Sequence, residues 1–173
     1  MNEVIICGFR FKLAGKFFKN PIPSKSKYNW DKRGENGKLI PVHEHITTCL
    51  DLLGQINPDK VCETAYLVTV DNMVMYVGEF SKTLRARWLK VDNYIWHNKD
   101  DLISDALMAK KIVKFYLLEE SELTLSCGLK LNIAKSVEHH ILKNVHELKE
   151  DACNDQPLKW NQRNKAKRGI KVS

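Results

Sequence analysis

Two strand-forming runs joined by a two-residue turn signal constrain the fold of this chain more than any other feature. The runs are AYLVTV, residues 65–70, and MVMYV, residues 73–77. Both are rich in β-branched, aromatic and methionine residues, which favour strands. Asp71-Asn72, the dipeptide between them, is typical of a tight turn. The sequence therefore predicts an antiparallel hairpin over residues 65–77.

Periodicity and breaking residues predict the other elements of a mixed α/β or α+β fold. The expected elements are a strand over 4–13, a helix from about His43 to Leu53, a short helix over 81–89 capped by Ser81, a helix over 100–111, a strand over 112–118 and an amphipathic helix over 132–149 capped by Asn132.

An acidic residue falls inside the apolar stripe of the last of these helices. At 100° per residue, Glu138 projects between Ala134 and Ile141, which belong to the face that should pack on the protein core. A carboxylate in such a place needs a partner, because burying an unpaired charge is costly. Glu138 is therefore a candidate functional residue.

The charge of the chain indicates an anionic partner. Lys and Arg outnumber Asp and Glu by 28 to 21, a formal net charge of +7. The excess gathers in residues 10–33 and 159–171, where aromatic residues accompany the basic ones, a combination that suits nucleic acid. The apolar runs are too short to cross a bilayer. We expect a cytoplasmic protein without a membrane partner, and the five scattered cysteines contain no C-x-x-C zinc motif.

Tyr66 lies on the first of the two strand-forming runs, Tyr76-Val77-Gly78 ends the second and continues past it, and Arg87 lies in the short helix expected after them. Glu138 follows on the amphipathic helix, and Lys159-Trp160-Asn161 comes after that helix.

The order of these elements and residues, over residues 62–161, resembles the GIY-YIG endonuclease superfamily. Tyr66 matches the end of the first family motif, and Tyr76-Val77-Gly78 matches the second. Arg87 stands where the family keeps its catalytic arginine, and Glu138 where it keeps its metal-binding carboxylate. Lys159-Trp160-Asn161 is similar to the closing Trp-Asn of the family. Among relatives, the chain looks most like the small phage endonucleases and the GIY-YIG type II restriction enzymes.

The resemblance implies a fold and a domain organisation. The expected core is a small three-stranded antiparallel sheet flanked by helices, preceded by a basic N-terminal extension. On this basis residues 1–60 form a DNA-contacting arm, and residues 61–173 form the nuclease core with its basic C-terminal tail.

The same resemblance implies a set of site residues. Tyr66, Tyr76, Arg87 and Glu138 would be catalytic, and Glu138 would bind Mg²⁺, for which Mn²⁺ can substitute. Val91 stands where relatives often place His or Tyr, so Tyr94 or His97 would supply that group, and His97 is the histidine to test. Glu79 follows the second motif where some relatives carry lysine. The residues expected to contact nucleic acid are Lys27, Lys32, Arg33, Lys82, Arg85, Asn161, Arg163 and Lys165.

The expected function is Mg²⁺-dependent hydrolysis of phosphodiester bonds in double-stranded DNA. A sequence-specific type II restriction enzyme, working as a homodimer without a small-molecule cofactor, is the first reading. A phage-type endonuclease of low specificity and a catalytically silent nucleic-acid-binding module are the alternatives.

Strand parity tests whether the two tyrosines can share one site. With a regular two-residue turn at Asp71-Asn72, Tyr66 would pair with Val77, and Tyr76 would point to the opposite face of the sheet. Both hydroxyls reach one site only if the loop has an odd length or a strand bulges, and we predict such a loop.

Overall fold

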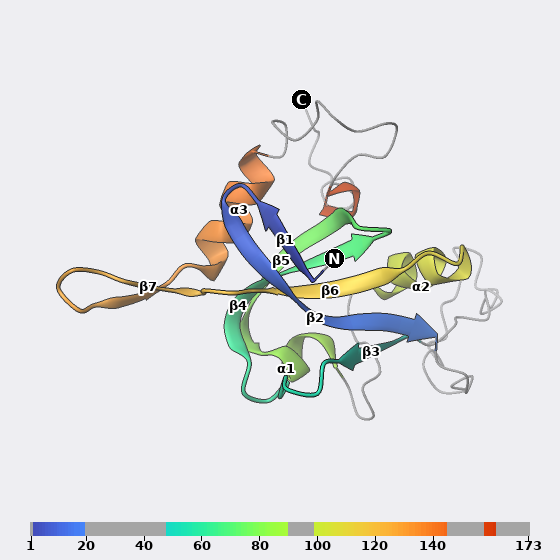
Figure 1. The fold of residues 1–173 in the computed structure, drawn as a ribbon, viewed down its shortest axis with the longest axis horizontal. Helices are drawn as coiled ribbons and strands as arrows, with labels where there is room; N and C mark the ends of the chain where they lie inside the picture. The colour runs from blue at the N-terminus through green and yellow to red at the C-terminus, as the bar shows by residue number, and fades with distance from the viewer. Residues whose placement is uncertain (1, 20–47, 90–98, 145–157, 162–173) are drawn as a thin grey trace, which may run out of the picture.

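The chain adopts an α+β fold built around one large antiparallel sheet (Figure 1). The computed structural model describes residues 2–19, 48–89, 99–144 and 158–161. Its elements are β1 (Glu3–Ile6), β2 (Phe9–Lys19), β3 (Thr48–Leu52), β4 (Cys62–Val70), β5 (Met73–Thr83), α1 (Leu84–Trp88), α2 (Asp100–Met108), β6 (Val113–Leu118), β7 (Glu122–Thr124), β8 (Lys130–Asn132) and α3 (Ala134–Asn144).

The sheet is larger than the three strands expected. Its order is β1-β2-β6-β4-β5, with β3 also paired to β2, so it has six strands, and β7 and β8 form a separate hairpin. The three predicted strands are neighbours, as β6, β4 and β5. The other three come from residues 3–52, the region expected to be an arm. They pair through β2, which covers the edge of β6 that a three-stranded sheet would leave open.

Two of the elements predicted before residue 60 are wrong. The single strand expected over 4–13 is a hairpin, because Cys7 and Gly8 turn the chain with φ angles of 49° and 81°. Residues 48–52 form strand β3 instead of part of a helix, since Leu50 and its neighbours pair with β2 and their buried side chains join the core. Pairing with β2 overrides the local preference of this segment.

The β4–β5 hairpin is present, and it contains a bulge. Asp71 and Asn72 form the two-residue turn, with φ angles of 50° and 70°. The register then shifts between Val68 and Thr69, so Val68 lies opposite Tyr76 and Tyr66 lies opposite Gly78. The expected odd loop is therefore wrong, and the alternative, a bulged strand, is what places both tyrosines on one face.

Helices cover both faces of the sheet. On one face, Trp88 of α1 and Ile103 of α2 pack in a cluster with Tyr66 and Phe115. On the other face, Val137 and Ile141 of α3 pack with Ala65, Leu67 and Val77. Strand β4 is buried on both sides, because its alternate side chains enter the two clusters. The predicted helix over 100–111 and strand over 112–118 are confirmed as α2 and β6.

The short helix after the hairpin begins later than expected. Strand β5 continues to Thr83, and α1 starts at Leu84 with Thr83 as its N-cap, so the predicted cap at Ser81 is wrong. The Thr83 hydroxyl accepts a hydrogen bond from the Ala86 N–H at 3.2 Å, which satisfies a donor of the first helical turn. Asn132 does the same at the start of α3, because its amide oxygen accepts a hydrogen bond from Ala134 N–H at 3.0 Å.

The remaining elements of the described ranges are the strands β7 and β8. The β7–β8 hairpin projects from the body of the molecule (Figure 1) and exposes Leu123 and Leu131, which face each other across it. None of the helices in the described ranges is both long and apolar enough to cross a membrane.

Candidate active site at the edge strand

Tyr66 and Tyr76 lie side by side in the sheet, as the bulge requires. Their ring centroids are 5.8 Å apart, and the two side chains are buried. Tyr66 also packs against Trp88 of α1, with centroids 5.3 Å apart and the rings nearly perpendicular. The ring of Tyr66 is thus held on several sides, which fixes the direction of its hydroxyl.

Arg87 brings a guanidinium group to these phenols. It lies in the last turn of α1 and donates a hydrogen bond to Tyr66. Burial alone would lower the pKa of Arg87, but Tyr66, Tyr76 and Glu79 outweigh it, so the pKa is raised. The guanidinium is therefore a permanent charge at the opening of the site.

Both tyrosines keep their protons in this environment. Burial raises the pKa of Tyr66 well above its ordinary value, and the nearby Arg87 offsets this only in part. The pKa of Tyr76 is also raised, again first by burial, against the influence of Tyr66 and Arg87. The neutral phenols are set up to donate hydrogen bonds. A role as general base needs further positive charge to lower these pKa values.

Glu138 interacts with the same residues from α3, the helix on the other face of the sheet. It lies on α3 between the buried residues Val137 and Ile141 and is itself half-buried, as the helical periodicity predicted. Its pKa is raised, first by burial and then by the Glu79 carboxylate, and is lowered in part by Arg87 and Lys135. Glu138 also acts on the pKa of Tyr76. The four residues predicted to be catalytic on these elements therefore form one electrostatically coupled group.

Glu79 is a member of this group that the sequence analysis did not select. It lies on β5 opposite Ala65, on the face covered by α3, and it is half-buried. It acts on both Arg87 and Glu138. The available signal was its position two residues after Val77, which puts both side chains on the same face of the strand.

A cavity of about 250 Å³ opens beside this group. Its walls come from the end of β5 and from α1, and they include Glu79 and Arg87. The lining residues are Glu79, Phe80, Ser81, Lys82, Ala86 and Arg87. Because β5 is an edge strand, a ligand could approach the guanidinium here without displacing another strand.

The donor set fits a hard divalent cation that keeps most of its water. Glu138 and Glu79 offer carboxylate oxygens, and within the described ranges no three His, Cys, Asp or Glu side chains gather as a metal cluster. Mg²⁺ is commonly held by one or two carboxylates together with water and substrate phosphates. Zinc, which favours four nitrogen or sulfur ligands, has no such set in this part of the chain.

Some residues predicted to contact nucleic acid are engaged elsewhere in the fold. Lys82 is exposed on β5 beside the cavity. Arg85, in contrast, pairs with Asp59 at 2.7 Å. Several predicted residues lie outside the described ranges, namely Lys27, Lys32, Arg33, Tyr94, His97, Arg163 and Lys165.

The Asn161 side chain is hydrogen-bonded to the backbone of the edge strand β5. Its amide oxygen accepts a hydrogen bond from Val77 N–H at 3.0 Å, and its amide nitrogen donates to the Val77 carbonyl at 2.7 Å. Nearby, the buried Lys99 donates to the Trp160 carbonyl at 2.7 Å, and its ammonium lies 5.1 Å from the centre of the Tyr76 ring. Residues 158–161 are thereby tied to the strand that carries Tyr76.

No family model matches the chain, and no curated protein matches it either. Among solved structures, the chain is similar to a mutant of bacteriophage T4 EndoII, with 19% sequence identity and a TM-score of 0.34. That similarity covers 56% of this chain and 78% of the other.

Proposed function

We propose that this protein is a Mg²⁺-dependent endonuclease that hydrolyses double-stranded DNA. The observation that carries the proposal is the convergence of Tyr66, Tyr76, Arg87 and Glu138 at the edge of the sheet. These residues come from β4, β5, α1 and α3, and their order along the chain resembles that of the GIY-YIG nucleases. Chance placement of one tyrosine or arginine is common, whereas a coupled group drawn from four elements is not.

Each residue has a task that its environment suits. Glu138, held half-buried on α3, would bind the Mg²⁺ ion, with Glu79 as a neighbouring carboxylate. A bound Mg²⁺ supplies Lewis acidity at the phosphate and lowers the pKa of a bound water. Arg87 would direct its guanidinium fork at the non-bridging phosphate oxygens, where negative charge develops during hydrolysis.

The phenols would position the reacting groups. Tyr66 is held by the hydrogen bond that Arg87 donates to it. Glu138 acts on the pKa of Tyr76, so Tyr76 is the phenol that we place beside the carboxylate. As neutral hydroxyls they can hold the attacking water or the phosphate by hydrogen bonds. Were a bound cation and Arg87 together to lower the pKa of Tyr76 enough for the phenol to lose its own proton to solvent, the resulting phenolate could take a proton from the water.

The finer proposal is a sequence-specific type II restriction enzyme that acts as a homodimer. One metal centre cuts one strand, so a double-strand break calls for two centres, and two-fold symmetry would match a palindromic target. A phage-type endonuclease of low specificity is the alternative within the same chemistry.

Incubation of the full chain with supercoiled plasmid and Mg²⁺, followed by gel electrophoresis, tests the proposal. Discrete fragments are expected from a restriction enzyme, and a smear from a nuclease of low specificity. The Glu138→Gln variant should retain binding to a DNA duplex and lose cleavage. Glu120→Gln, at an exposed glutamate, is the matched control and should cut normally.

Intact plasmid with wild-type protein, in Mg²⁺ and in Mn²⁺, would instead favour a catalytically silent binding module. Equal cleavage by wild type and Glu138→Gln would remove the carboxylate from the mechanism and point to a contaminating nuclease.

A further inference from the structure

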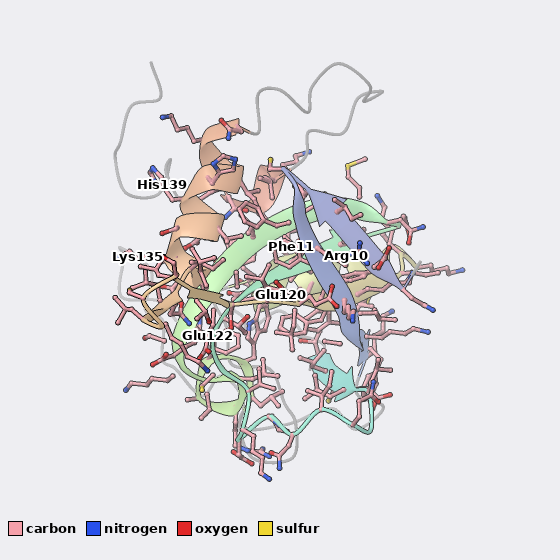
Figure 2. The ribbon with its side chains drawn as sticks, turned by 60° about the vertical axis from the view of Figure 1, so that its left-hand side comes forward. Arg10, Phe11, Glu120, Glu122, Lys135 and His139 are labelled. Carbon is pink, nitrogen blue, oxygen red and sulfur yellow. The ribbon has the colours of Figure 1, made fainter. Side chains whose placement is uncertain are left out.

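The outer face of α3 carries a group of exposed polar and basic side chains, and one of them, His140, also packs against Phe9 with the ring centroids 5.8 Å apart. Figure 2 shows Lys135 and His139 on the side of this helix that is turned away from the sheet. They belong to a set that lines a hollow of about 490 Å³, consisting of Lys135, Ser136, His139, His140 and Lys143. We call this set the α3 outer face. The opposite side of the helix is buried through Ala134, Val137 and Ile141.

Three residues of the α3 outer face form a line along the helix. Lys135, His139 and Lys143 are four residues apart, so they lie one above another on consecutive turns. Their line is about 12 Å long at 1.5 Å per residue. One strand of a DNA duplex advances about 3.4 Å along the axis per phosphate while it winds around the axis, so a line of this length can reach more than one phosphate of the same strand.

The two lysines of this face form no direct ion pair within the described part of the chain. The single acidic residue of α3 is the half-buried Glu138. Arg10 and Lys12 on β2 differ, because both pair with Glu119. A phosphate can therefore bind the lysines of α3 without first displacing a carboxylate.

The α3 outer face also begins next to the candidate active site. Lys135 and Glu138 are three residues apart on the helix and interact electrostatically. A phosphate held by Lys135 would lie close to the carboxylate proposed to bind Mg²⁺. The face is thus placed to set the register of a polymer of phosphates relative to the site of cleavage.

We infer that the α3 outer face binds the phosphate backbone of double-stranded nucleic acid and positions one phosphate at Glu138. This inference rests on the proposed function, and it adds the surface that holds the substrate. The chemistry of the face favours a duplex, because binding of single strands relies on exposed aromatic platforms, and the five residues of the face include no Phe, Tyr or Trp. Contacts of this kind carry no base sequence information, so they would act alike on all duplexes.

Binding of a mixed-sequence 30-base-pair duplex to the full chain tests the inference. Fluorescence anisotropy in EDTA, over a range of salt concentrations, reports the number of phosphate contacts as the slope of log K against log salt. The Lys135→Gln/Lys143→Gln double variant should reduce the slope by about 2, close to 0.9 for each lost contact. The Lys60→Gln/Lys111→Gln double variant removes the same charge at other exposed positions and should leave the slope unchanged.

The outcomes separate this inference from the proposed function. A lower slope for the α3 variant supports the inference, even if the wild-type protein never cuts DNA. An unchanged slope, or an equal loss in the Lys60 and Lys111 control, overturns it, even if the wild-type protein cuts normally. Loss of binding to anionic phosphatidylserine vesicles with an unchanged duplex slope also overturns it and identifies a lipid surface instead.

Discussion

The Tyr66 hydroxyl occupies the space that a side chain on Gly78 would need. A Cβ atom built on Gly78 would fall 2.5 Å from the phenolic oxygen of Tyr66 and 2.7 Å from Cζ. The two residues lie directly opposite each other on β4 and β5. The glycine of the Tyr76-Val77-Gly78 motif is thus the reason that the Tyr66 ring can lie flat across the neighbouring strand and reach Arg87.

Gly78→Ala should therefore displace Tyr66. The added methyl group cannot fit unless the buried ring moves, and such overpacking costs about 1–3 kcal/mol of the free energy of unfolding. The hydrogen bond from Arg87 to Tyr66 should be weakened at the same time, with a loss of cleavage larger than the loss of stability explains. Urea unfolding and plasmid cleavage, measured on the same protein, check both effects.

Gly54→Ala is the matched control for this substitution. A Cβ atom on Gly54 would meet nothing within 4 Å. The change should leave both stability and cleavage near the wild-type values. A Gly78→Ala protein with wild-type stability and activity would mean that the Tyr66 ring is not held against this glycine.

Arg87→Lys should reduce cleavage although it keeps the positive charge. Lysine cannot reproduce the planar fork that can bond Tyr66 and a phosphate together. A loss of about 100-fold or more in the single-turnover rate is expected, similar to the loss of a donor to a developing oxyanion. Arg85→Lys is the control, because Arg85 pairs with Asp59 and should change the rate little. Equal rates for wild type and Arg87→Lys would exclude the bidentate role.

The raised pKa of Glu138 predicts a stability that depends on pH in metal-free protein. Between the ordinary value of 4.5 and the higher folded pKa, the folded state binds more protons than the unfolded state. The free energy of unfolding therefore falls as the pH rises through this window. Glu138→Gln removes the effect, so it should stabilise the protein at pH 8 by less than about 1 kcal/mol, since solvent screens the half-buried group.

The stabilisation by Glu138→Gln should vanish at about pH 3, well below both pKa values, where the carboxyl is neutral in either state. Thermal unfolding in EDTA at the two pH values measures it. Glu120→Gln, at an exposed position, should change the Tm little at either pH. A Glu138→Gln protein that is less stable than wild type at pH 8 would show that the charged carboxylate has a stabilising partner.

Mg²⁺ should raise the Tm of the wild-type protein and leave that of Glu138→Gln unchanged. A ligand that binds only the folded state stabilises it by about 2.7 kcal/mol at 100 times its Kd. For a chain of this size, that energy corresponds to a Tm rise of roughly 5–10 °C. The readout does not depend on cleavage, so it also tests the metal site in a protein that cannot cut. A similar rise in the Glu138→Gln variant would place the ion elsewhere.

The sequence predicted best those features that depend on local chemistry. The turn at Asp71-Asn72, the helix beginning at Asp100 and the burial of Glu138 each follow from residues close together in the chain. Parity also showed that two tyrosines could share a face only through a bulge or an odd loop. It could not choose between them, because the bulge, which leaves Met75 of β5 as the extra residue opposite the Val68–Thr69 step of β4, depends on the pairing of the two strands and not on a local motif.

Features that depend on distant pairing were missed. Strand β3 is a strand only because β2, more than 30 positions earlier in places, lies beside it. Glu79 belongs to the site only because α3 packs on its face of β5. Lys99 is the strongest case, since lysine is almost never fully buried and no local pattern predicts that it will be.

Lys99 should stabilise the fold by holding the segment that ends at Asn161. Its side chain is 1% exposed, its ammonium donates to the Trp160 carbonyl at 2.7 Å, and the charge lies over the Tyr76 ring. Lys99→Met keeps the length of the side chain but leaves that carbonyl without this donor. The expected loss is about 1–3 kcal/mol of the free energy of unfolding, the usual result of removing one partner from a buried hydrogen bond.

Urea unfolding of Lys99→Met beside Lys159→Met measures this contribution. Lys159 is exposed and adjacent to Trp160, so its substitution removes the same charge without touching the buried contact, and it should have little effect. Taking an ammonium out of water has a cost that opposes this contribution. A Lys99→Met protein as stable as wild type would mean that this desolvation offsets the hydrogen bond and the contact with Tyr76. In that case the segment would be held against β5 by the hydrogen bonds that Val77 makes with Asn161, by the bond from Leu158 N–H to the Val74 carbonyl, and by the burial of Leu158 and Trp160.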